Sequence, residues 1–423
     1  MKRTLFAFLL ALLPLTACGS RGSTSPTGAI DSTSVTFLLS FKADNALRLD
    51  LLPLKEQSFA VSTGLDSSAR EHQLTLKLQE ADDAFAALIT TIDSSILTAR
   101  IPYGHYRLGQ VHEFTLQPVA PKVMIGPLGV LLEQRKLEIP HGQYSGITHV
   151  EGDRYAVVHD KKATLFYFTL HFLPDGRLSY VSSFETEPAG AQARDPEDIV
   201  YIPEDQSFYI CDEASQSIRE CYLTGKESGR ELSIPDDLKA SRPNAGFEAL
   251  AYTDSTLWTT TEFPLPAEFL PRMHRFQTFS LGTRTPAARF LYQADAPSVS
   301  ETDRDRATAY VHGISAMTAL PDGRIVVLER EVYVPGGSLF EKLGAFTESK
   351  LYSVSPKDDP AGILQKTLIA PVFRTNAFNL ANYEGMCTGP VLQDGRQTLL
   401  LIADSQDGAE GLTSEYLQVI VLP

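Results

Sequence analysis

Acidic side chains recur in this chain at the ends of short apolar segments, in five similar units. In each unit a Gly or a Glu leads a first apolar segment, and a second apolar segment ends in Asp or Glu. The leading residues are Gly146, Glu197, Glu248, Gly313 and Glu384, and the closing acids are Asp160, Asp212, Glu262, Glu329 and Asp404. Carboxylate oxygens without clustered His or Cys are ligands for a hard cation, and a wide set of them suits Ca²⁺ better than Mg²⁺. These eight acids are the candidate metal ligands.

The spacing of these units predicts the elements that position the acids. The leading residues follow one another at intervals of 51 to 71 residues, near the period of about 40 to 50 residues that is typical of a β-propeller blade. The second segments, such as Tyr155–Val158 and Ile325–Leu328, are rich in β-branched and aromatic residues, and turn residues precede them. We predict an all-β fold with a β-propeller of five blades. A sixth blade is the alternative, formed within the long fourth unit or by the segment between Pro121 and Pro140.

An antiparallel pair of strands returns to the side from which it started. The leading and closing acids are therefore expected at one mouth of the axial channel. Carboxylates gathered there repel one another, so a cation or basic side chains must neutralise them. An alternative is that these acids cap strands and accept hydrogen bonds from backbone amides of the next blade.

Composition excludes one class of partner. The chain has 423 residues, of which 43% are hydrophobic and 21% are charged, enough for two ordinary domains. Its formal net charge is −15, and nucleic-acid binding requires a basic surface. We expect no nucleic-acid partner.

The first eighteen residues are typical of an export signal. Lys2 and Arg3 precede a short apolar stretch, and Leu15-Thr16-Ala17-Cys18 resembles the lipobox of bacterial lipoproteins. In such signals the Cys is lipidated, so Cys18 is expected to anchor the protein in the cell envelope, at the outer membrane. Residues 19–28 are rich in Gly, Ser, Thr and Pro and predict a flexible tether. An ordinary secretory signal is the alternative.

Residues 29–119 have a different character. Short β-forming segments without a helical period predict a small β-sandwich that holds the propeller off the membrane or binds a partner. Pro118 and Pro121 mark its boundary with the propeller domain, 122–423. Cys211 and Cys221 flank a predicted turn and could form a disulfide, with free buried thiols as the alternative.

Several segments of the second domain resemble one known family. Gln143-Tyr144-Ser145-Gly146-Ile147, Gly246-Phe247-Glu248-Ala249-Leu250 and Asn382-Tyr383-Glu384-Gly385-Met386 are similar to motifs of the bacterial phytase-like family, also labelled esterase-like. The resemblance runs from about Lys122 to Pro423. It implies Ca²⁺ ions in an acidic channel and hydrolysis of phosphate esters, with a small anionic or phosphorylated substrate.

The resemblance also implies catalytic roles for several basic residues. Arg330, Arg194 and Lys161 would pair with phosphate, and His159 or His312 would protonate the leaving alcohol. The structural alternatives are that Arg330 pairs with Glu329 and Glu331 and that both histidines belong to the core. 

The resemblance to the phytases themselves is incomplete. The segment Asp195-Pro196-Glu197-Asp198 departs from their Asp-Asp-Pro-Ala motif, because Arg194 replaces the first Asp and Glu197 replaces the Ala. No Gly-x-Ser-x-Gly elbow is present to supply a serine nucleophile. A calcium-dependent lactonase fits the acids as well, and a non-catalytic propeller that binds a small ligand or a glycan is the alternative from another class.

Overall fold

The computed structural model describes residues 33–423 except 44–45, 54–62, 65–70, 79–84, 92–95, 102–105, 189–194, 240–245, 267, 269, 357–361 and 407–412. The predicted signal, Cys18, the tether and Arg194 lie outside the described residues. Within the described part of the chain, no helix is long and apolar enough to cross a membrane.

The C-terminal part is a β-propeller, and its described residues form five sheets. The first sheet contains β11 (Tyr144–Glu151), β12 (Arg154–His159), β13 (Lys162–Phe172) and β14 (Leu178–Pro188). The second contains β15 (Pro196–Ile202), β16 (Ser207–Asp212), β17 (Ser217–Tyr222) and β18 (Glu227–Glu231). The third contains β19 (Phe247–Thr253), β20 (Thr256–Thr261), β21 (Met273–Ser280) and β22 (Thr285–Gln293).

The two remaining sheets use strands from the segment that precedes the propeller. The fourth contains β23 (Ala309–Ala319), β24 (Ile325–Val334), β25 (Phe346–Val354), β26 (Lys366–Leu368) and β9 (Val123–Ile125), and β27 (Phe373–Asn376) also pairs with β25. The fifth contains β28 (Asn382–Val391), β29 (Gln397–Asp404), β30 (Tyr416–Val421) and β10 (Val130–Lys136). The segment between Pro121 and Pro140 therefore completes two sheets and forms no further blade.

The first strands of the five sheets surround the axis. Each of β11, β15, β19, β23 and β28 contacts the next, and β28 contacts β11 again. The second strands are buried along almost their whole length, as their unbroken apolar segments predicted. Glycines permit the close approach of the first strands: a Cβ on Gly146 would lie 2.2 Å from Asp198 Oδ1, and one on Gly313 would lie 2.3 Å from the Glu262 carbonyl oxygen.

The N-terminal part is a sandwich of two sheets. One contains β4 (Glu71–Leu78), β1 (Val35–Lys42) and β7 (Val111–Thr115). The other contains β3 (Thr63–Gly64), β2 (Ala46–Pro53), β5 (Phe85–Thr91), β6 (Ile96–Ile101) and β8 (Gln117–Val119). Phe37 and Phe41 of the first sheet share a core with Leu49 and Leu97 of the second.

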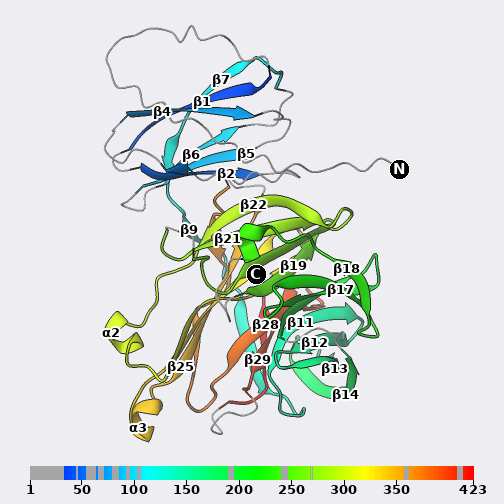
Figure 1. Cartoon of the computed structure of the whole chain (residues 1–423). Coiled ribbons are helices and arrows are strands. Elements are labelled where there is room, and N and C mark those ends of the chain that lie inside the picture. The colour runs from blue at the N-terminus through cyan, green and yellow to red at the C-terminus, as the bar shows by residue number, and fades with distance from the viewer. Residues whose placement is uncertain are drawn as a thin grey trace.

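The sandwich lies beside β22 of the propeller (Figure 1). Ile96 and Val119 of the sandwich pack against Leu270, Met273 and Leu291 of the third sheet. Three short helices, α1 (Asp236–Lys239), α2 (Glu301–Arg304) and α3 (Leu339–Lys342), complete the described elements. 

Of the two possibilities for Cys211 and Cys221, the structure shows free buried thiols and not a disulfide. Cys211 and Cys221 are free and buried, as is Cys387. In the pairing of β16 with β17, Cys211 lies opposite Ile218 and Cys221 lies opposite Phe208, so the two thiols are out of register.

Candidate functional site

Six carboxylates gather at one end of the propeller axis, and we call them the acid ring. Three lie near the starts of first strands and three at the ends of second strands, as the antiparallel geometry predicted. They are Glu197, Glu248 and Glu384, and Asp160, Glu262 and Asp404. Five of these residues are less than a tenth exposed, and the side chain of Glu384 is 12% exposed. The ring is thus almost fully removed from solvent.

Arg330 lies at the centre of the acid ring. Its Nη1 atom is 2.5 Å from Glu384 Oε1, and its Nη2 atom is 2.5 Å from Glu262 Oε1 and 4.0 Å from Glu248 Oε1. The guanidinium also donates to Asn382 Oδ1 at 2.9 Å. Its side chain is only 4% exposed, so it serves the ring as a buried counter-ion.

The alternative that pairs Arg330 with its sequence neighbours is wrong. Successive side chains of a strand point to opposite faces, so Glu329 and Glu331 of β24 lie on the face away from the acid ring. Glu331 accepts hydrogen bonds from the backbone N–H groups of Ser298 and Val299 and from the Tyr310 hydroxyl.

Arg330 alone cannot neutralise six ionised carboxylates, so the carboxyl groups of the acid ring resist ionisation. Burial raises the pKa of Asp160 to about 7 and, against the opposing charge of Arg330, that of Glu262 to about 6. The pKa values of Glu197, Glu248 and Asp404 also lie well above the usual range, because burial and the charges of the other ring acids both disfavour ionisation. Such a site gains from binding a cation.

A set of oxygen ligands lies at the edge of the ring. Carboxylate oxygens of Asp160, Asp195 and Glu197 lie within 4.8 Å of one another. Lys161 lies among them, with its Nζ atom 2.5 Å from Asp160 Oδ1 and 2.6 Å from Asp195 Oδ1. The Lys161 side chain is 58% exposed, whereas the two carboxylates are 12% and 13% exposed. The ammonium group of Lys161 therefore forms ion pairs with two nearly buried carboxylates and lies on their solvent side.

Two predicted ligands do not belong to the ring, which corrects those predictions. Asp212 accepts hydrogen bonds from the backbone N–H groups of Asp195 and Ser215. Both donors belong to its own sheet, whereas the strand-cap alternative expected amides of the next blade. Glu329 accepts from the Tyr292 hydroxyl at 2.5 Å and from Lys366 Nζ at 2.5 Å. 

Glu329 belongs instead to a second charged group, which we call the lysine cluster. Its members are Asp295, Glu329, Lys350 and Lys366, together with the hydroxyls of Tyr292 and Tyr352.

The two candidate histidines, His159 and His312, differ in their exposure to solvent. His159 is 1% exposed, and its ring nitrogens lie 3.3 and 3.1 Å from the backbone nitrogens of Gln143 and Lys161, as the core alternative predicted. His312 is partly exposed and lines a narrow cleft with Arg330 and Lys350. Burial lowers the pKa of His312, which favours its neutral form at pH 7.

Sequence reasoning missed some residues of the site. Asp195 was noted only as part of a motif, although it directly precedes Pro196 and Glu197 at the start of β15. Asn382 and Ser145 were also missed: Asn382 Nδ2 donates to Glu384 Oε1 at 2.7 Å, and Ser145 Oγ donates to Glu197 Oε2 at 3.1 Å. Asp195 and Asn382 each lie two residues before a leading Glu, and Ser145 directly precedes the leading Gly146, which was the available signal.

The chain matches a known protein family over most of the propeller. The phytase-like family, described as "Esterase-like activity of phytase", matches residues 139–406. The chain belongs to this family. The match includes all six acids of the ring and Arg330. No curated protein matches the chain.

Solved structures provide only distant likenesses to this phytase-like chain. The WD40 β-propeller domain of Doa1 is 10% identical, with 68% of this chain and 95% of that chain covered and a TM-score of 0.32. The Dos1 propeller is 7% identical, with coverage of 82% and 75% and a TM-score of 0.29. The PQQ-bound aldose sugar dehydrogenase of Streptomyces coelicolor is 13% identical, with coverage of 79% and 91% and a TM-score of 0.29. Likenesses this distant carry no information about the site.

Proposed function

We propose that this phytase-like protein is a Ca²⁺-dependent hydrolase of phosphate esters that acts at the acid ring. The observation that carries the proposal is the charge imbalance of the ring, where six buried carboxylates surround one guanidinium. A divalent cation would neutralise this excess and attract an anionic substrate to a surface of net negative charge.

The donor set fits calcium. Asp160, Asp195 and Glu197 would hold the ion, because they present oxygen atoms within one coordination sphere and no His or Cys ligand lies among them. When bound, a divalent cation supplies neutralising charge for a phosphoryl group and lowers the pKa of a water molecule.

Other residues of the site would bind the substrate and position the ring acids. The exposed Lys161 would move from Asp160 and Asp195 to a phosphate oxygen. Arg330 would position Glu262 and Glu384, because its Nη1 and Nη2 atoms are already bound to them. The buried His159 would support the loop at Asp160. His312 lies opposite Glu331, on the face of β24 away from the acid ring, so it receives no role in the reaction.

The first test combines calcium titration calorimetry on residues 19–423 with phosphate release from phytate and simple phosphomonoesters, with and without a chelator. We expect calcium binding and release that the chelator abolishes. Calcium binding without release would contradict the hydrolase and leave the metal site intact. Absence of both would overturn the two together.

Glu384→Gln separates catalysis from folding. Loss of one ring charge is expected to lower phosphate release by about 100-fold or more, the scale of losing one electrostatic group of an active site. Unfolding by urea should change little, because Gln keeps the shape and an acceptor oxygen for Arg330. The exposed Glu187→Gln is the matched control and should retain full activity. Equal activity of the Glu384 and Glu187 variants would contradict the catalytic assignment.

A non-catalytic, ligand-binding propeller is the second candidate. The observation that favours it is Arg330, a permanent cation that already fills the centre of the ring. For such a protein, calcium would alter stability, and ligand affinity would appear without product. The same calorimetry and release measurements distinguish the two.

We also propose that Cys18 carries the lipid anchor and places the protein in the bacterial cell envelope. Its lipobox-like context supports this. Labelling with a fatty-acid analogue should modify the wild type and not Cys18→Ser. A labelled Cys18→Ser variant would contradict the anchor.

A further inference from the structure

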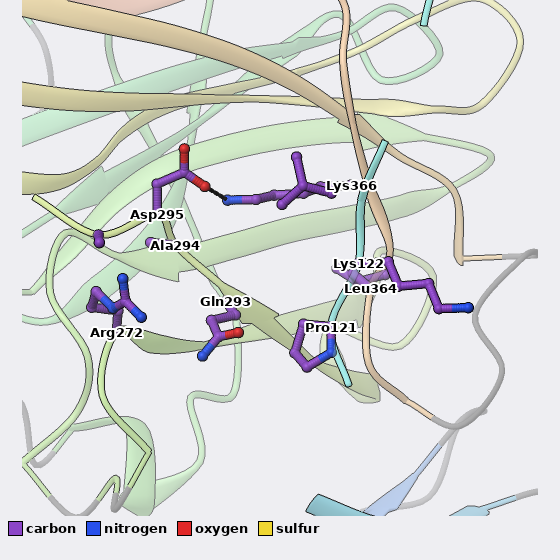
Figure 2. Close-up of a pocket in the computed structure, with 10 residues that line it drawn as sticks. Pro121, Lys122, Arg272, Gln293, Ala294, Asp295, Leu364 and Lys366 are labelled. Atoms are coloured by element: carbon purple, nitrogen blue, oxygen red, sulfur yellow. Dashed lines mark ion pairs between the residues drawn. The ribbon is translucent and has the colours of Figure 1, made fainter. Parts of the chain in front are cut away.

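A second polar cavity, outside the acid ring, lies where the sandwich joins the propeller. Its volume is about 150 Å³, room for about five water molecules. Three segments line it (Figure 2). They are the connection at Pro121–Val123, the third sheet at Gln293 with the preceding turn at Arg272, and the fourth sheet at Lys366 with the preceding residue Leu364. We call it the junction cavity.

Arg272, which lines this cavity, has an unfavourable backbone conformation. It occupies the third position of a turn from Leu270 to Met273, closed by a hydrogen bond from Met273 N to Leu270 O of 3.2 Å. Pro271 suits the second position of such a turn, and the third position favours Gly or Asn. Arg272 nevertheless has a φ of 61° there. Backbone strain at a non-glycine residue persists where the surrounding structure holds it, often at a ligand site.

The side chain of Arg272 has no binding partner in the described part of the chain. Among the residues that the structure describes, no carboxylate pairs with its guanidinium and no acceptor receives its N–H groups. The Gln293 side chain, which also lines the cavity, is likewise without a hydrogen-bond partner in the described ranges. Two planar donor groups therefore face one small space.

The rest of the cavity is electrically balanced. Asp295 is 2.7 Å from Lys366 Nζ and 3.0 Å from Lys350 Nζ, and Lys366 also pairs with Glu329. Lys122 is exposed, and its ammonium points away from the other lining residues (Figure 2). One positive charge, on Arg272, is therefore left without compensation. Pro121, Ala294, Ala296 and Leu364 make the remaining wall apolar.

We propose that the junction cavity binds a small organic monocarboxylate. The fork of the Arg272 guanidinium matches a planar carboxylate in bidentate fashion, and the Gln293 amide supplies a further donor. The apolar wall suits a short carbon chain. A phosphate dianion fits less well, because only one of its charges would be compensated and Asp295 would repel the other. This site is separate from the acid ring and does not depend on the proposed hydrolase activity.

Calorimetry with propionate, propionamide and inorganic phosphate on the wild-type protein tests the proposal. We expect propionate to bind, its neutral amide not to bind, and phosphate to bind at least about tenfold more weakly, the scale of one charge-assisted hydrogen bond. Tighter binding of phosphate, equal binding of propionamide, or no binding of propionate would each overturn the proposal.

Substitution of Arg272 provides a second test. Arg272→Gln should weaken propionate binding at least tenfold, since it removes the charge and the fork. Arg272→Gly should abolish binding while the melting temperature stays equal or rises, because Gly accepts a positive φ without strain. The matched control is Arg284→Gly, since Arg284 has a φ of 57° in another turn and does not line the cavity. Wild-type affinity in both Arg272 variants would overturn the assignment.

Discussion

The acid ring and the lysine cluster are both buried groups of charges, and one strand serves both. Arg330 of β24 points into the acid ring, and its neighbour Glu329 points into the lysine cluster. In the lysine cluster, Asp295 and Glu329 pair with Lys350 and Lys366. Glu348, which also pairs with Lys350, is matched by Arg374, so negative and positive charges balance. In the acid ring, six carboxylates share one guanidinium, with Lys161 at the edge.

The two groups therefore shift their carboxyl pKa values in opposite directions. Burial alone would raise the pKa of Asp295, but hydrogen bonds and charge from Lys366 lower it to about 2. Asp160 is also bonded to a lysine, yet burial and the neighbouring Asp195 raise its pKa to about 7. A balanced cluster is complete without a ligand, whereas an unbalanced one retains the capacity to bind a cation.

Removal of the central cation should have the largest effect. In Arg330→Met, Glu262 and Glu248 lose their only described partner, and a buried carboxylate without a partner is costly. We expect the free energy of unfolding at pH 8 to fall by about 3–5 kcal/mol, measured by urea denaturation in chelator. Calcium or a lower pH should restore part of the loss.

Lys366→Met is the matched substitution in the lysine cluster. Glu329 keeps the Tyr292 hydroxyl and the Asp295 N–H, and Asp295 keeps Lys350 and Tyr352. The loss should therefore be smaller than for Arg330→Met, and calcium should not reverse it. An equal loss in both variants, with no response to calcium, would show that the ring is as self-sufficient as the cluster.

The pH dependence of stability should distinguish the two groups next. Asp160 and Glu262 of the ring have folded-state pKa values above those of the unfolded chain, so the folded protein binds more protons. Their contribution to stability is fully present below about pH 4 and is lost as the pH rises through about 6 and 7. Asp295 behaves oppositely, since its lowered pKa contributes stability above about pH 4 that is lost as the pH falls through about 2.

We therefore expect the free energy of unfolding to decrease between pH 5 and pH 8 by the order of 1 kcal/mol for each ring carboxyl that ionises. Urea denaturation at several pH values in chelator measures this. Asp160→Asn should flatten the profile between about pH 4 and 7, and Asp295→Asn should leave that part unchanged. A wild-type stability that rises from pH 5 to pH 8 would contradict the raised pKa values.

Sequence reasoning located the acid ring because two simple regularities sufficed. The repeat gave the blades, and the antiparallel return of each strand pair placed Glu197, Glu248 and Glu384 beside Asp160 and Asp404. The lipobox-like signal and the substrate class are predictions that this structure leaves untested. The leading glycines were recognised as markers, but their cause is the close approach of neighbouring first strands, which only the three-dimensional structure shows.

The errors have a common physical origin in strand length and register. Glu329 was expected at a strand end, but β24 continues to Val334, so alternation decides where its side chain points. Arg330 was expected to pair with its sequence neighbours, whereas the carboxylates that bind it belong to the third and fifth sheets. The bond between Lys161 and Asp195 joins two blades and leaves no local signal in the sequence.

The smallest change in stability is expected at Lys161, and it gives the sharpest test of the unbalanced ring. Its side chain is 58% exposed, so Lys161→Met should alter the free energy of unfolding by less than about 1 kcal/mol.

The ammonium group of Lys161 nonetheless lies beside Asp160 and Asp195, where calcium would bind. Loss of this competing charge should raise calcium affinity about tenfold, equivalent to about 1.4 kcal/mol. Calorimetry measures the affinity, with the exposed neighbour Lys162→Met as the control. Unchanged or weaker calcium binding in Lys161→Met alone would mean that the lysine completes the charge balance at this edge, as Lys366 does in the lysine cluster.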